Sequence, residues 1–137
     1  MSKNWYGDIQ KMHKKFGVKD KTQTLDNDKL KAYLKFRFKF LDEELNEGHR
    51  AMLEKNPEEI VDALIDLCVV AIGTLDAYGV DGQKAWDEVL KANMSKKVGI
   101  KESRPNPFGL PDLIKPEGWV PPSHEGNHGI IPNAFVK

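Results

Sequence analysis

The sequence predicts an all-α protein with a four-helix-bundle-like fold, followed by an irregular C-terminal tail rich in Pro and Gly. Two observations favour this fold class. Between residues 5 and 98, apolar residues recur at spacings of three and four, which is the period of an amphipathic helix. After Gly99 the chain holds seven of its eight prolines, and proline cannot continue a helix. We therefore expect a helical bundle over residues 1–98 and a tail over residues 99–137, both within one domain.

The first predicted helix runs from Trp5 to Phe16, because its apolar residues fall on one face and Gly17 can end it. The polar stretch KDKTQTLDND that follows is expected to be a connector. A second helix then begins near Asp28 and runs to Gly48 or slightly beyond. Its phenylalanines alternate as in a strand, but its leucines keep the helical period. These leucines are Leu30, Leu34, Leu41 and Leu45.

The third predicted helix begins with a capping signal, in which Asn56 is the N-cap, Pro57 the first residue and Glu59 the third. It runs to about Tyr78, where Gly79 stops it, and it is apolar on nearly every face, which is typical of a helix buried in protein. A fourth helix begins near residue 81 and fades between residues 97 and 99. The residues expected to face inward from it are Ala85, Trp86, Val89, Leu90 and Met94.

The composition excludes several classes of partner. The 21 basic and 21 acidic residues cancel, which removes the electrostatic attraction to a nucleic acid polymer or an anionic membrane. The single cysteine, Cys68, permits no disulfide within the chain, and the first residues lack the apolar run of a signal peptide. We expect a cytoplasmic protein. Three histidines without metal-ligand spacing are interpreted as surface or packing residues, namely His13, His49 and His124.

Acidic residues on two predicted helices are spaced to meet. Glu59, Asp62 and Asp66 recur at i, i+3 and i+7, which places them along one stripe of the third helix. If the second and third helices pack antiparallel, Glu44 and Glu47 come level with Glu59 and Asp62. Ligation by oxygen alone is what Mg²⁺ and Mn²⁺ prefer. Because Mg²⁺ usually takes further oxygens from phosphates, these carboxylates indicate a phosphate-bearing substrate.

The same acids also have interpretations that need no metal. Acidic residues on helices often form a solvated face, and Glu59 has a structural role in the capping box. Capping explains neither Asp62 nor Asp66, since both lie beyond the first turn of an apolar segment. A buried ion pair with Arg37 or with a lysine would satisfy them without a metal.

The acidic pattern is also the point at which the sequence resembles a known family. Glu43-Glu44-x-x-Glu47, followed by Glu59-x-x-Asp62, resembles the EExxE and ExxD motifs of the MazG-like all-α nucleoside triphosphate pyrophosphohydrolases. This superfamily also contains phosphoribosyl-ATP pyrophosphohydrolases and dimeric dUTPases. Further stretches are similar to its compact, phage-type branch and together span most of residues 8–122. They read DIQKMHKKFGV, DALIDLCVVAIGTLDAYGVD, WDEVLKANMSK and LIKPEGWVPP.

The resemblance implies a hydrolase that uses Mg²⁺, with Mn²⁺ able to substitute, and splits nucleoside triphosphates into the monophosphate and pyrophosphate. Residues 1–98 would be the catalytic bundle. Glu43 is less favoured as a metal ligand than the other motif acids, because it points about 100° away from Glu44. Asp66 is expected either to hold a further metal or a water, or to accept a hydrogen bond beside the site. The residues implied as metal ligands and catalytic groups are Glu44, Glu47, Glu59 and Asp62.

The resemblance also implies which groups bind the substrate. Asn93 and Lys96 are expected to bind phosphate first and Lys115 second, although lysines at a helix end also stabilise the helix macrodipole. Arg37 is expected to reach a phosphate or to pair with a motif acid. Trp119 is expected either to stack on a base or to anchor the tail in the core.

Three hypotheses for function follow. The leading one is a nucleoside triphosphate pyrophosphohydrolase that acts on the nucleotide pool, with a deoxynucleotide expected as substrate, in the host cytoplasm if a phage encodes it. The alternative enzyme is a phosphoribosyl-ATP pyrophosphohydrolase, and the alternative class is a non-catalytic helical module that binds a nucleotide or a partner. A homodimer or homotetramer is expected, as in the family, because the third helix has more apolar faces than a thin bundle can cover.

Overall fold

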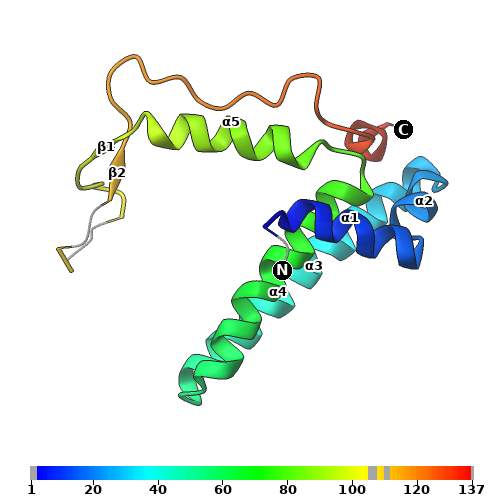
Figure 1. Ribbon diagram of the computed structural model, residues 1–137, viewed down its shortest axis with the longest axis horizontal. Coiled ribbons are helices and arrows are strands. Elements are labelled where there is room, and N and C mark those ends of the chain that lie inside the picture. The colour runs from blue at the N-terminus through cyan, green and yellow to red at the C-terminus, as the bar shows by residue number, and fades with distance from the viewer. Residues whose placement is uncertain (1–2, 105–107, 110–111, 137) are drawn as a thin grey trace. The chain divides into compact units, whose positions relative to one another are not determined.

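The computed structural model describes residues 3–104, 108–109 and 112–136. Within these residues the chain forms five α-helices, two short strands and one 3₁₀ helix (Figure 1), which confirms the all-α fold class. Contacts divide the chain into two compact units, one made of Met1–Gly82 with Gly126–Lys137 and the other of Gln83–Glu125. The expected single domain stays a prediction. None of the described helices combines the length and the apolar character that a membrane span requires.

The first unit begins with two helices where one was predicted. Helix α1 spans Trp5–Phe16, and it ends at Gly17, whose φ of 72° lies in the left-handed region. Helix α2 then spans Val18–Gln23, so the expected connector is wrong over this segment. Although most of its residues are polar, this helix has a buried position at Thr22. The Thr22 hydroxyl donates a hydrogen bond to the Val18 carbonyl at 2.7 Å.

Two long helices form the body of the first unit. Helix α3 spans Asn27–Leu53, a few residues past the predicted end, and α4 spans Pro57–Ala77. The predicted cap of α4 is confirmed, because the Asn56 side chain accepts a hydrogen bond from the Glu59 backbone at 3.2 Å. The two helices lie side by side (Figure 1), and they come close where Gly48 faces Ala63.

The core of the first unit lies where α3 and α4 meet the end of the chain. Tyr78, fully buried, donates a hydrogen bond from its hydroxyl to the Leu30 carbonyl. The 3₁₀ helix η1, Ile131–Phe135, packs against this core through Ala134, and the Ile130 backbone donates to the Tyr78 carbonyl at 2.8 Å. The end of the expected irregular tail is therefore ordered and completes the core.

A buried polar network fixes α1 to α4. His13 is 3 % exposed and Asp76 is 1 % exposed, and His13 Nδ1 lies 2.7 Å from Asp76 Oδ2. The Tyr6 hydroxyl donates to the Val80 carbonyl at 2.6 Å, beside the same carboxylate. His13 is thus a buried packing residue, one of the two interpretations given for it, and its hydrogen-bond partner lies 63 positions away in the sequence.

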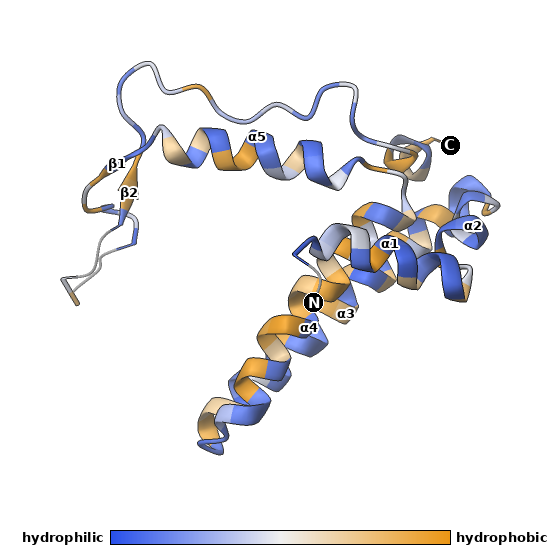
Figure 2. Ribbon diagram, in the orientation of Figure 1, coloured by the Kyte–Doolittle hydropathy of each residue, from blue (hydrophilic) through white to orange (hydrophobic). Residues whose placement is uncertain are grey.

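Helix α4 is less buried than its composition predicts. Its outward face carries Val61, Leu64 and Ile65, which are 61 %, 58 % and 45 % exposed. Figure 2 shows hydrophobic residues along most of this helix. In a single chain α4 therefore presents an apolar face to solvent, which agrees with a helix that has more apolar faces than one thin bundle can cover.

The second unit contains α5 and a segment that returns along it. Helix α5 spans Gly82–Met94, and the two-residue strands β1 (Lys97–Val98) and β2 (Leu113–Ile114) pair antiparallel. The return segment is fixed to α5 by Trp119, whose Nε1 donates to the Ala92 carbonyl at 2.9 Å. Within this unit Ala92 is buried and the large apolar residues of α5 are exposed, so the predicted inward face of α5 stays a prediction. These exposed residues are Trp86, Val89, Leu90 and Met94.

Candidate active site

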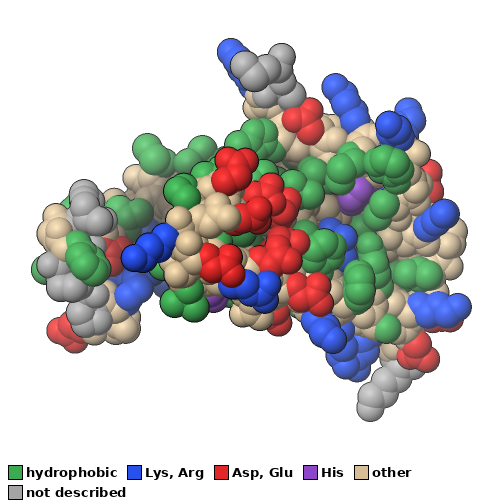
Figure 3. Space-filling view, turned by 90° about the horizontal axis from the view of Figure 1, so that it is seen from below, with side chains coloured by type: hydrophobic (Ala, Val, Ile, Leu, Met, Phe, Trp, Pro, Cys, Tyr) green, Lys and Arg blue, Asp and Glu red, His purple; other side chains and the backbone are tan. Residues whose placement is uncertain are grey.

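Four carboxylates from two helices meet on the surface of the first unit. Glu44 and Glu47 come from α3, whereas Asp62 and Asp66 come from α4. Burial, and then the carboxylates of Glu47, Asp66 and Asp62, raise the pKa of Glu44. We call these four residues the acidic cluster, and Figure 3 shows a face of the molecule on which Asp and Glu side chains gather beside hydrophobic ones.

The pKa of Asp66, on the α4 side of the cluster, is shifted in the same direction as that of Glu44. Burial, and then the carboxylates of Asp62 and Glu47, raise the pKa of Asp66. Both shifts mean that negative charge at this place is unfavourable unless a cation compensates it. Among the described residues, no Lys, Arg or His forms an ion pair with a member of the cluster.

Glu44 carries the clearest sign of an incomplete site. Its Oε2 atom is buried and has no hydrogen-bond partner among the described residues. A buried carboxylate oxygen without a partner is costly, and native proteins rarely keep one without a reason. The position therefore suits a ligand that brings positive charge.

Asp62 and Asp66 are the α4 carboxylates whose charges raise the pKa of Glu44, and the expected place of Glu59 in the site stays a prediction. Glu59 lies in the first turn of α4, where it is exposed. Asp62 is exposed as well, so the expected burial of Asp62 is wrong in the single chain.

Among the described residues Arg37 forms no ion pair with a motif acid, and its predicted contact with a phosphate stays a prediction. Its Nε donates to Thr74 Oγ1 and its Nη2 to the Val70 carbonyl, both at 2.9 Å. The guanidinium also lies over the rings of Tyr33 and Phe40, at 6.0 and 5.8 Å. Arg37 therefore joins α3 to the second half of α4, and it does not form the ion pair with the cluster acids that would have replaced a metal.

The acidic cluster fits a divalent cation by donor chemistry. In the described part of the chain, no three Asp, Glu, His or Cys side chains are already grouped as ligands around one point. The cluster nevertheless offers only carboxylate oxygens, which hard cations such as Mg²⁺ prefer, and its enclosed Glu44 oxygen lacks a donor. Mutual repulsion keeps such carboxylates apart when nothing positive lies between them.

The predicted phosphate-binding residues lie in the second unit. Lys96 Nζ and Lys115 Nζ approach the ring of Trp119, at 5.3 and 5.0 Å from its centroid. Asn93 is exposed on the last turn of α5, one turn before Lys96. The structure thus brings Lys96, Lys115 and Trp119 together, although they come from different segments of the sequence.

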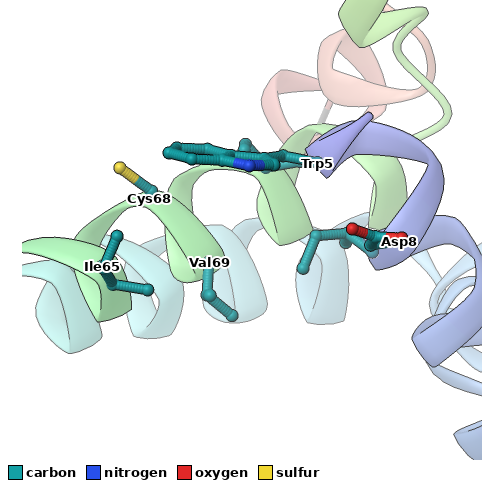
Figure 4. A pocket seen from close by; sticks show the side chains of 7 residues that line it. Trp5, Asp8, Ile65, Cys68 and Val69 are labelled. Atoms are coloured by element: carbon teal, nitrogen blue, oxygen red, sulfur yellow. The ribbon is translucent and has the colours of Figure 1, made fainter. Parts of the chain in front are cut away.

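An apolar cavity of about 290 Å³ lies between α1 and α4. Figure 4 shows the Trp5 ring above Cys68, with Ile65 and Val69 beside it and the Asp8 carboxylate at the edge. Most of its lining is apolar, with the Asp8 carboxylate and the Trp5 indole N–H as polar groups, so it offers few of the convergent polar groups that fix a nucleobase. It continues the exposed apolar face of α4.

An all-α fold that brings the acids of two adjacent helices together is typical of the MazG-like superfamily of nucleotide pyrophosphohydrolases, which hydrolyse acid anhydrides. The particular family is shown by comparison. The model of the phosphoribosyl-ATP pyrophosphohydrolase family matches residues 9–93, more than half of the chain, and the chain belongs to this family. A comparison with curated proteins finds no match. The phage-type branch stays a prediction.

Proposed function

We propose that this protein is a metal-dependent pyrophosphohydrolase that converts a nucleoside triphosphate, with a deoxynucleotide as the expected substrate, into the monophosphate and pyrophosphate. The observation that supports this most is the enclosed, unpaired Glu44 oxygen within a cluster of carboxylates. Membership of a pyrophosphohydrolase family supports the reaction class.

The proposed cofactor is Mg²⁺, with Mn²⁺ able to substitute. Glu44, Glu47, Asp62 and Asp66 would hold it, and Glu59 is proposed as a further ligand from its sequence spacing to Asp62. When bound, the metal neutralises phosphate charge and makes an attacking water more acidic. A carboxylate of the cluster that is not occupied as a ligand can accept the proton of that water.

The proposed substrate contacts follow the chemistry of the triphosphate. Asn93 can donate hydrogen bonds, while Lys96 and Lys115 supply positive charge. Arg37 is proposed with less support, because two of its nitrogens already bind Thr74 and the Val70 carbonyl. Trp119 holds the return segment on α5, and this contact favours anchoring over base stacking.

Phosphoribosyl-ATP is the second candidate substrate. The family match favours it, since the matching model carries that activity in its name. Both candidates present a triphosphate to be cut between the α and β phosphates, so the acidic cluster would serve either.

The test is a pyrophosphatase-coupled phosphate assay on the purified protein. The substrates are the ribo- and deoxyribonucleoside triphosphates and phosphoribosyl-ATP, each with Mg²⁺, with Mn²⁺ or with EDTA. We expect pyrophosphate release that depends on the metal and is fastest with a deoxynucleoside triphosphate. Release from phosphoribosyl-ATP alone would establish the second candidate, and complementation of a histidine auxotroph would confirm it. If no substrate releases pyrophosphate, the result would instead indicate the non-catalytic helical module.

We also propose that the active form is a homodimer or homotetramer. The support is the apolar face of α4, where Val61, Leu64 and Ile65 are exposed, together with the apolar cavity beneath Trp5. Monomeric proteins rarely leave a continuous apolar face of this kind in water. A second copy can cover it through the same surface, as two-fold dimers do.

A further inference from the structure

Two contacts between α3 and α4 lie on either side of the acidic cluster. On one side, Gly48 of α3 faces Ala63 of α4, where a Cβ on the glycine would lie 3.5 Å from the alanine Cβ. On the other side, the Arg37 guanidinium of α3 reaches Val70 and Thr74 of α4. Along each helix, the acids of the cluster fall between these contacts or directly beside one of them. The way in which the two helices meet at the cluster therefore depends on both contacts.

The two contacts constrain the helices differently. The contact between Gly48 and Ala63 brings the helices close, but apolar contacts have no direction and permit sliding. The hydrogen bonds of Arg37 are directional, with Nε donating to Thr74 Oγ1 and Nη2 donating to the Val70 carbonyl, both at 2.9 Å. Because the guanidinium is planar and holds its donors in a rigid fork, these two bonds together fix the position of α3 along α4.

The Arg37 side chain is itself held in place. Its guanidinium lies over the rings of Tyr33 and Phe40, at 6.0 and 5.8 Å from their centroids. On α4, Gly73 leaves the space that the guanidinium needs, since a Cβ there would lie 2.7 Å from Nη2. Aromatic rings on one helix and a glycine on the other thus keep the guanidinium between α3 and α4.

We propose that Arg37 is a positioning residue for the metal site of the acidic cluster. Glu44 lies seven residues after Arg37, and Asp66 lies four residues before Val70, so both acids are within about two helical turns of these hydrogen bonds. A slip of α3 along α4 would move the Glu44 carboxylate relative to that of Asp66. Mg²⁺ tolerates little departure from octahedral geometry, so such a slip would weaken its binding. That the cluster holds a metal rests on the proposed function.

The experiment measures Mn²⁺ binding to the full-length protein without substrate, by electron paramagnetic resonance of the free ion. Arg37→Met removes both hydrogen bonds, and we expect it to weaken Mn²⁺ binding by about tenfold, as the loss of groups that orient metal ligands does. Arg37→Lys keeps the charge but not the fork, so it should bind Mn²⁺ nearly as weakly as Arg37→Met. Tyr6→Phe is the control, because it removes a hydrogen bond that joins α1 to the Val80 carbonyl and does not involve α3. It should bind Mn²⁺ as the unmodified protein does.

A milder variant tests the same contact from the other helix. Thr74→Val removes one acceptor of the guanidinium and keeps the shape of the side chain. We expect it to weaken Mn²⁺ binding in the same direction as Arg37→Met, but by less. Circular dichroism in EDTA shows which variants are folded, and Thr74→Val decides the question if Arg37→Met is not.

The outcomes separate the role of Arg37 from the proposed reaction. Unchanged Mn²⁺ binding in the folded Arg37→Met or Thr74→Val variant, full binding in Arg37→Lys, or an equal loss in Tyr6→Phe would each overturn the positioning role. If the unmodified protein hydrolyses a triphosphate while the Arg37 variants bind Mn²⁺ fully, the proposed function stands without it. If these variants lose Mn²⁺ binding but the unmodified protein hydrolyses no substrate, the positioning role stands and the proposed function fails. If the unmodified protein binds no Mn²⁺, the positioning role fails and the hydrolysis assay alone decides the function.

Discussion

At the scale of single residues, two adjacent acids differ in their surroundings. Glu43 is exposed, whereas Glu44 is half-buried, has an enclosed oxygen without a partner and lies beside the carboxylates of Asp62 and Asp66. Neighbours in a helix point about 100° apart, so one side chain joins the cluster and the other does not. This difference gives the proposed site a matched pair of variants.

We predict that Glu44→Gln loses pyrophosphohydrolase activity by at least about a hundredfold, because it removes charge from the proposed metal site. Glu43→Gln should keep activity within a few fold of the unmodified protein. The measurement is kcat/KM for the preferred triphosphate at saturating Mg²⁺. Equal losses in the two variants would contradict the assignment of Glu44 as a ligand.

Tyr78 supports a prediction about pH. Burial raises the pKa of its phenol, so the folded state holds the proton more tightly than the unfolded state. Its contribution to stability is complete below about pH 10, the ordinary tyrosine value, and is lost as the pH rises through the higher folded value. Tyr78→Phe should cost about 1 to 2 kcal/mol near neutral pH, where it removes the hydrogen bond to Leu30.

The same variant should lose less stability than the unmodified protein between neutral and strongly alkaline pH. Urea unfolding followed by circular dichroism at several pH values measures this. The raised pKa of Tyr6 is common to both proteins, so it does not affect the comparison. Parallel stability curves for the two proteins would show that Tyr78 does not contribute to alkaline unfolding.

At the scale of helices, two glycines show how closely α3 and α4 approach other groups. A Cβ at Gly48 would lie 3.5 Å from the Ala63 Cβ, which is an ordinary contact. A Cβ at Gly73 would lie 2.7 Å from Arg37 Nη2 and 3.2 Å from His13 Nε2. The Arg37 side chain cannot move freely, because it donates hydrogen bonds to Thr74 Oγ1 and to the Val70 carbonyl.

We therefore predict opposite effects for the same substitution. Gly48→Ala should stabilise the protein by up to about 1 kcal/mol, because alanine is the better helix former. Gly73→Ala should destabilise it by about 1 to 2 kcal/mol, because overpacking outweighs that gain. Urea unfolding at one protein concentration compares the free energies of unfolding of the two variants. A more stable Gly73→Ala variant would mean that the Arg37 and His13 side chains can shift at little cost.

At the scale of the whole molecule, the chain leaves the first unit at Gly82 and re-enters it at Gly126. Two hydrogen bonds join the chain next to these two positions. The Asn127 side chain accepts from the Asp81 backbone N–H at 2.8 Å and donates to the Asp81 carbonyl at 2.9 Å. The last residues then complete the core around Tyr78. Helices α4 and α1 of the first unit carry uncovered apolar surface, and this is where we place the contact with a second copy.

We predict that the protein sediments as a dimer or tetramer at micromolar concentration and that Ile65→Asp shifts it towards monomer. A charge in a buried interface would lack a partner, which makes association unfavourable. Val120→Asp, at another exposed apolar residue, should leave the assembly unchanged. Analytical ultracentrifugation gives the answer, and a monomeric unmodified protein would exclude this interface.

The sequence by itself determined the local features. The Asn56 cap, the stop at Gly17 and the helical period of α3 depend on residues within one or two turns, so they could be predicted without tertiary contacts. The spacing of the acids also predicted that α3 and α4 carry facing carboxylates. Helix α2 was missed because its signal is a single buried threonine in a polar stretch.

The tertiary structure alone decided which distant residues meet. It brought Asp62 and Asp66 close enough to Glu44 to raise its pKa, joined His13 to Asp76, and brought Lys96 and Lys115 to one tryptophan. Such pairings depend on the register between elements, and one turn of slip between helices exchanges the partners without changing either local pattern. The residue types predicted what kind of site the chain would form, whereas the packing of the helices determined which residues lie close together in it.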